Sequence, residues 1–162
     1  IHAGGPRFAQ PRIVDAYAIL HAVEFPMDIM FATAVIICGG VLERFPGLKV
    51  AFLEANCSWA PYLLWRMDEH FEHRDTYAKK HFSKTPSEYF RRQCFVAIEA
   101  DEHLGVKAAE AIGTDTVVFS TDVPHEDSRW PKAKEAFLKL PFDPAAQKKI
   151  LWDNAARLYG IG

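Results

Sequence analysis

Short apolar runs alternate with longer helical patterns along the whole chain, and this alternation most constrains the fold. Three runs have the length and the β-branched or aromatic content of strands. We expect strands at 48–53, 95–98 and 116–120, and helices at 13–23, 26–45, 58 or 59 to 80, 86–92, 101–112, 132–138 and 144–158. Such alternation predicts β/α units whose strands pair in parallel.

The number of these units is too small for a closed barrel. Counting a further strand that ends at Ile1, the sequence holds about four β/α units, whereas an eight-stranded TIM barrel takes about 250 residues. The 162 residues, 49% of them hydrophobic, still suit a single domain over 1–162 with a substantial core. We therefore expect an α/β fold that is half of a TIM (β/α)8 barrel, and a chain that is truncated or pairs with another half.

Composition excludes several classes of partner. A net charge of −2, with basic and acidic residues interspersed, gives no field for nucleic acid or an anionic membrane. The apolar run 29–42 is shorter than the roughly 20 residues that span a bilayer, so we expect a buried helix there. Cys38, Cys57 and Cys94 lie in apolar contexts, which indicates thiols in a reducing compartment and a cytoplasmic protein. Small molecules remain as the expected ligands.

The end of the third expected strand carries two chemically useful side chains. Asp122 follows the run Val117–Ser120, and His125 comes three residues later. In parallel α/β barrels the reactive groups lie at the carboxyl ends of strands, so Asp122 is a candidate metal ligand or proton acceptor and His125 a group that orients it or contacts substrate. The alternatives are a turn cap for Asp122 and loop packing for His125.

A second carboxylate ends the first expected strand. Glu54 follows the apolar segment 50–53 and is expected at the same mouth as Asp122, where it would ligate a metal or accept a proton. The alternative is a helix cap or a partner for a nearby cation. Asn56 and Trp59, in the loop that follows, are candidate substrate-binding residues, and core packing is the alternative for Trp59.

Four segments together are similar to one known family. They are HAGG at 2–5, GGVLERFPGLKV at 39–50, STDVPH at 120–125 and NAARLY at 154–159. In this order they resemble the carboxyl-terminal half of the amidohydrolase-2 family, which includes aminocarboxymuconate-semialdehyde decarboxylase and related metal-dependent TIM-barrel decarboxylases and hydrolases. The resemblance covers nearly the entire chain.

The resemblance implies a divalent ion, zinc first and manganese second. The family binds it with an HxH pair on the first strand, a His after the fifth and an Asp after the eighth. His2 and Asp122 match the last two positions, while the chain contains no HxH, so part of the ligand set is expected upstream of Ile1. A homo-oligomer or the missing half would complete the site.

Glu54 decides which reaction we expect. It stands where decarboxylases of this family carry a His, so the favoured function is hydrolysis of a small carboxylic or cyclic substrate by metal-activated water. Decarboxylation of an aromatic or semialdehyde acid is the alternative. Two other hypotheses are a non-catalytic half-barrel that acts through assembly and a metal-free binding module.

Overall fold

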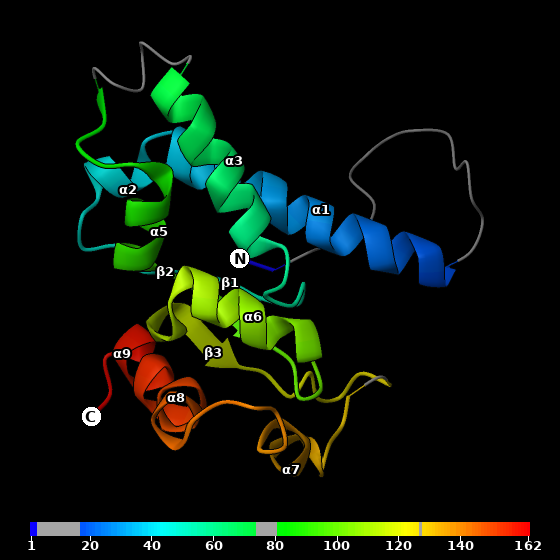
Figure 1. The fold of residues 1–162 in the computed structure, drawn as a ribbon. Coiled ribbons are helices and arrows are strands. Elements are labelled where there is room, and N and C mark those ends of the chain that lie inside the picture. Colours follow the sequence, from blue (N-terminus) through cyan, green and yellow to red (C-terminus); the bar gives the residue numbers. More distant parts are fainter. Residues whose placement is uncertain (3–16, 74–80, 127) are drawn as a thin grey trace.

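The computed structural model describes residues 1–2, 17–73, 81–126 and 128–162, and Figure 1 shows their arrangement. Three parallel strands alternate with helices, as the sequence predicts. The order is α1 Tyr17–Cys38, α2 Val41–Arg44, β1 Val50–Phe52, α3 Ala60–His73, α5 Pro86–Gln93, β2 Cys94–Ile98, α6 His103–Ile112, η1 Thr114–Thr116, β3 Val117–Phe119, α7 Ala133–Phe137, α8 Pro144–Lys148, η2 Lys149–Asp153 and α9 Asn154–Tyr159.

The sheet is parallel throughout, with strand order β1-β2-β3. In its register Ala51 lies beside Phe95, and Ala97 beside Val118. His2 adds a parallel bridge to Leu53, and the Leu53 amide donates to the Ile1 carbonyl at 2.9 Å. Four parallel segments therefore lie side by side, which agrees with the four β/α units expected.

The two faces of the sheet differ in what covers them. One face, formed by residues such as Phe52, Val96 and Val117, packs into the main core with buried side chains of α1, α3, α5 and α6. The other face holds only a small cluster of Phe95, Ala97 and Val118, with Ala51, Leu53 and Leu158 packed against it. Phe137 of α7 and Ile150 of η2 also belong to the main core. In Figure 1, α1, α3 and α5 lie above the sheet, and α8 and α9 lie below β3.

The start of the chain differs from the prediction. We expected one helix to end at 23 and a second to run from Pro26 to 45, but α1 continues through Pro26 to Cys38. Proline removes one helical hydrogen bond, whose acceptor would be the carbonyl of Ala22, and Ala22 is exposed so that water can satisfy it. Gly39 and Gly40 then end the helix, Gly40 with a φ of 73° that favours glycine.

This longer helix changes the expectation for the apolar run 29–42. The window His21–Cys38 of α1, with a mean hydropathy of 1.5, is long and apolar enough to cross a bilayer, by length and composition only. Only 17% of that window is buried, so the expected buried helix is instead buried along one face. Ile29, Thr33 and Ile37 are buried there, and Phe25, Met30, Ala34 and Ile36 are partly buried against the same core. Core helices of soluble proteins pass the same test of length and composition.

The remaining elements lie close to their predicted bounds. The helix from 86 has a capping box, in which Thr85 accepts from the Glu88 amide and the Glu88 carboxylate accepts from the Thr85 amide. The predicted helix 144–158 is present as α8 and α9 joined by a π-helical turn, η2. The predicted segments 3–12, 13–16 and 74–80 lie outside the described residues.

The C-terminal helix is tied to the edge of the sheet through Asn154. Its buried side-chain amide donates to the carbonyls of Thr114 and Val117, both at 2.7 Å. These bonds satisfy backbone acceptors at the start of β3, where the described sheet ends.

We expect Asn154→Ala to lower the free energy of unfolding by about 1–3 kcal/mol, because two buried carbonyls lose their donor. Urea unfolding followed by circular dichroism measures this. Gln147→Ala is the matched control, since its amide makes one exposed bond of 3.3 Å to Leu138, and it should change stability by less than about 0.5 kcal/mol. Equal effects of the two substitutions would contradict the role given to Asn154.

Candidate functional site

The residues that follow β1 and β3 have unusual backbone conformations. Glu54, Asn56 and Asp122 have φ values of 68°, 57° and 58°, in the left-handed region that non-glycine residues seldom adopt. Each such residue costs roughly 1–2 kcal/mol, and strain of this kind gathers at functional sites. Two of the three are the carboxylates that the sequence nominates as site residues.

The side chains of the nominated residues converge on Glu54. Ligand-type atoms of Glu54, Asp122 and His125 lie within 4.8 Å of one another. Nε2 of His125 lies 3.8 Å from one Glu54 carboxylate oxygen, and Nε2 of His2 lies 2.5 Å from the other. Parallel strands bring this about, because the residues that follow them meet at one edge of the sheet.

The Glu54 carboxylate is the least solvated member of this group. Its side chain is 15% exposed, whereas those of His2 and His125 are 60% and 58% exposed. Oε2 of Glu54 is buried and accepts no hydrogen bond, since its close contact with His2 lacks hydrogen-bond geometry. A buried acceptor without a donor is rare in proteins and calls for a positive charge. The set of imidazoles and carboxylates therefore fits a divalent ion such as zinc or manganese.

A tight turn fixes the relation of Asp122 to His125. The His125 amide donates to the Asp122 carbonyl at 2.9 Å, and the Asp122 amide donates to the hydroxyl of Ser120 at 3.3 Å. Ser128 closes the loop by donating its hydroxyl to the carbonyl of Thr121 at 2.6 Å. Because His125 comes three residues after Asp122, this turn brings its imidazole back to the end of β3.

The loop that carries Glu54 is held by a residue that sequence reasoning missed. Glu102, directly before α6, accepts from the amides of Cys57 and Ser58 at 3.0 and 2.9 Å and from the Ser58 hydroxyl at 2.5 Å. Its carboxylate therefore connects the loop after β1 to the loop after β2. The sequence did hold a signal, because Glu99, Asp101 and Glu102 follow the second strand as Glu54 follows the first.

The two predicted substrate-binding residues lie in the same loop, and the packing of Trp59 differs from that of a substrate contact. Trp59 is only 9% exposed, packs edge-on against Phe52 with ring centroids 6.4 Å apart, and donates its indole N–H to the Asn56 carbonyl at 2.9 Å. This is the core position that the sequence left as the alternative. Asn56 is half-buried, and the hydrogen bond to Trp59 uses its backbone.

Cys57 is close to Glu54 in sequence but is not a nucleophile. Burial, reinforced by the neighbouring Glu102 carboxylate, raises the pKa of its thiol far above the ordinary value. The reactive form of cysteine is the thiolate, so this side chain is inert at neutral pH.

A second group of possible ligand atoms, those of Glu69, Glu72 and His73, is exposed on the surface of α3. These residues belong to a solvated, charged face of the helix.

We expect Glu102→Gln to lower the free energy of unfolding by about 1.5–3 kcal/mol. The neutral amide oxygen is a weaker acceptor for the three donors that now bond to Oε1, and the NH₂ group would face the Cys57 and Glu99 amides that now donate to Oε2. Thermal or urea unfolding measures the change. Glu110→Gln on the same helix removes only an exposed ion pair with Lys107 and should stay within about 0.5 kcal/mol. If Glu102→Gln were as mild as this control, the proposed connection between the two loops would be wrong.

The chain is similar to known enzymes over almost its full length. It is 26% identical to gamma-resorcylate decarboxylase of Polaromonas sp. JS666 over 165 residues, which cover 99% of this chain and 50% of that protein. The chain thus spans about half the length of this curated relative.

Solved structures give the same result for the fold. A dihydroxybenzoic acid decarboxylase from Polaromonas sp. JS666, with bound manganese and the inhibitor 2-nitroresorcinol, superimposes with a TM-score of 0.79 at 24% identity and covers 99% of this chain and 48% of its own. An amidohydrolase from Mycobacterium avium subsp. paratuberculosis K-10 has a TM-score of 0.72 at 28% identity, covering 85% and 34%. The sequence pattern of the family described as Amidohydrolase (Amidohydro_2) matches residues 1–161, and the chain belongs to this family.

Proposed function

We propose that this chain is part of a divalent-metal-dependent decarboxylase that acts on a small hydroxylated aromatic acid. The observation that carries the metal site is the convergence of His2, Asp122 and His125 on the buried Glu54 carboxylate. The reaction class is supported by the similarity to gamma-resorcylate decarboxylase over 99% of the chain. The sequence alone favours hydrolysis over decarboxylation, and this proposal reverses that order.

Asp122 and His2 are the proposed metal ligands, with Glu54 and His125 beside them. A site of this family needs further ligands, which we propose come from the other half of the barrel or from another chain. Manganese is the first ion to test, because it is bound in the Polaromonas decarboxylase structure, and zinc is the second. Such an ion, when bound, supplies positive charge that holds the substrate's oxygens and stabilises developing negative charge.

The chain's own residues are suited to moving the proton that decarboxylation requires. The reaction adds a proton to the ring carbon that bears the carboxylate, after which the bond to the carboxylate breaks, its electron pair returns to the ring and carbon dioxide leaves. We assign this proton to Glu54, because the side chains of His2 and His125 converge on its carboxyl group at the strand ends. His125, 3.8 Å from Glu54 and largely exposed, is placed to exchange protons between Glu54 and water.

Hydrolysis is the second candidate function, and Glu54 is the observation that favours it. A carboxylate beside a metal site accepts a proton from water and so generates a nucleophile, but it cannot act as the neutral imidazole that decarboxylases of this family carry at this position. We keep Asn56 as a proposed substrate contact and a homo-oligomer as the proposed assembly.

We expect Asp122→Asn to weaken the binding of Mn²⁺ or Zn²⁺ at least roughly tenfold, since even outer partners of metal ligands typically contribute 10- to 100-fold. Isothermal titration of the metal into chelator-treated protein measures this. Asp115→Asn is the matched control, because Asp115 precedes β3 at the opposite end of the strand and pairs with Lys149. Unchanged affinity in Asp122→Asn would remove Asp122 from the site.

The reaction products distinguish the two candidate reactions, and they are measured with the whole protein that contains this chain. With 2,6-dihydroxybenzoate, a decarboxylase releases carbon dioxide and resorcinol in equal amounts, and Glu54→Gln should slow this at least roughly 100-fold because a proton-transfer group contributes about 10²–10⁴-fold. Isotope-labelled carboxylate gives the measurement. Hydrolysis of an aryl ester or lactone without any carbon dioxide release would instead support the second candidate.

A further inference from the structure

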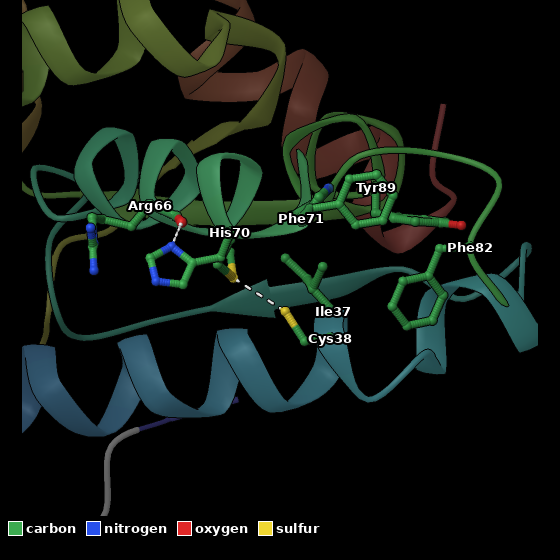
Figure 2. A pocket seen from close by; sticks show the side chains of 9 residues that line it. Ile37, Cys38, Arg66, His70, Phe71, Phe82 and Tyr89 are labelled. Carbon is green, nitrogen blue, oxygen red and sulfur yellow. Dashed lines mark hydrogen bonds between the residues drawn. The ribbon is translucent and has the colours of Figure 1, made fainter. Parts of the chain in front are cut away.

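A cavity lies in the helix layer, away from the strand ends that carry Glu54 and Asp122. It opens between the C-terminal part of α1 and the middle of α3, and the segment that leads into α5 closes one end (Figure 2). Its volume is about 290 Å³, and a cavity of about 150 Å³ already holds a benzene ring. The space therefore suits one substituted ring.

Most of its wall is apolar. Ile37 forms the floor on α1, Met67 and Phe71 come from α3, and Phe82 and Tyr89 lie together at one end (Figure 2). The rings of Phe82 and Tyr89 meet edge to face, with centroids 6.1 Å apart. The Tyr89 hydroxyl is directed away to Glu43 and Ser83, so the ring alone contributes to the wall.

The opposite end is cationic. Arg66 and His70 lie next to each other on α3, both exposed, and Nδ1 of His70 bonds to the Arg66 carbonyl at 2.9 Å. This bond makes Nδ1 the donor, so Nε2 can donate to a ligand only when the ring carries a second proton. Among the described residues, neither the Arg66 guanidinium nor His70 Nε2 has a protein hydrogen-bond partner or ion pair. Apolar walls with a small number of polar groups at one end are typical of small-molecule sites.

We propose that this cavity binds a small apolar monocarboxylate, with its ring among Ile37, Phe71 and Phe82 and its carboxylate at the Arg66 guanidinium. The ring gains the burial of apolar surface, and the guanidinium offers two parallel donors to a carboxylate. None of the described side chains that line the cavity is acidic, so its charge favours an anionic ligand over a cationic one. The site is separate from the proposed catalytic site and does not depend on a metal.

The cavity contains its own reporter, the thiol of Cys38. Cys38 lines the cavity and is exposed, and its Sγ lies 3.7 Å from Sδ of Met67. Cys57 and Cys94, by contrast, are 0% and 1% exposed, and burial raises the pKa of Cys94 to about 12. In the folded protein a maleimide should therefore react at Cys38 much faster than at the other two thiols.

The experiment is protection of Cys38 from N-ethylmaleimide by phenylacetate, in metal-free protein so that the catalytic site is not involved. We expect saturable slowing of the reaction, and a roughly threefold to fivefold weaker effect from phenylacetamide, which has the same ring but no charge. Mass spectrometry of the peptide that contains Cys38 gives the rate.

Two variants test the arrangement of the site. Arg66→Gln should weaken protection by phenylacetate about as much as replacing phenylacetate with the uncharged phenylacetamide does. It should leave protection by phenylacetamide unchanged. Lys107→Gln on α6 removes a distant exposed cation and serves as the matched control. Phe82→Ala should weaken both probes. The proposal is overturned by any of three results: no protection at millimolar phenylacetate, equal protection in Arg66→Gln, or a Cys38 that reacts as slowly as Cys57 because something covers the cavity.

Discussion

Parallel pairing in one register is the constraint on which the rest of the structure depends. Because β1, β2, β3 and the residues Ile1–His2 run in the same direction, everything that follows a strand gathers at one edge of the sheet. That edge holds the strained residues Glu54 and Asp122, the imidazoles of His2 and His125, and the Glu102 carboxylate that joins two loops. A shift of one residue in a strand would turn its side chains to the other face and separate this group.

The sequence predicted those features that depend on local pattern. β-Branched and aromatic runs identified each strand to within two residues, and Pro86 identified the start of α5. The site residues were nominated because a carboxylate after an apolar run is a local signal. Their mutual distances follow only from the parallel register, which the pattern implies but does not measure.

What the sequence did not predict depends on contacts between distant segments. Pro26 reads as a helix boundary, yet α1 continues through it because the carbonyl left without a donor faces water. Glu102 reads as one more charge at a helix start, and its role appears only when its partners at Cys57 and Ser58, over forty positions earlier, are seen beside it. The same is true of Trp59, an aromatic loop residue by sequence and a core residue by packing.

The described residues leave some apolar surface exposed to solvent. Val23, Met27, Phe31 and Val35 are spaced four residues apart along α1, and each is between 46% and 65% exposed. The inner face of the sheet carries only a small cluster around Phe95 and Val118. Both features agree with a chain whose relatives are about twice as long.

The central claim is that a divalent ion binds where His2 and His125 meet Glu54 and Asp122. Paramagnetic broadening by Mn²⁺ of the histidine ring-proton signals in NMR spectra tests it most directly, because the effect falls steeply with distance from the ion. We expect substoichiometric Mn²⁺ to broaden the signals of His2 and His125 first and to leave those of His73 and His103 sharp. Broadening that begins at His73, beside the exposed carboxylates of α3, or that affects all seven histidines alike, would contradict the account.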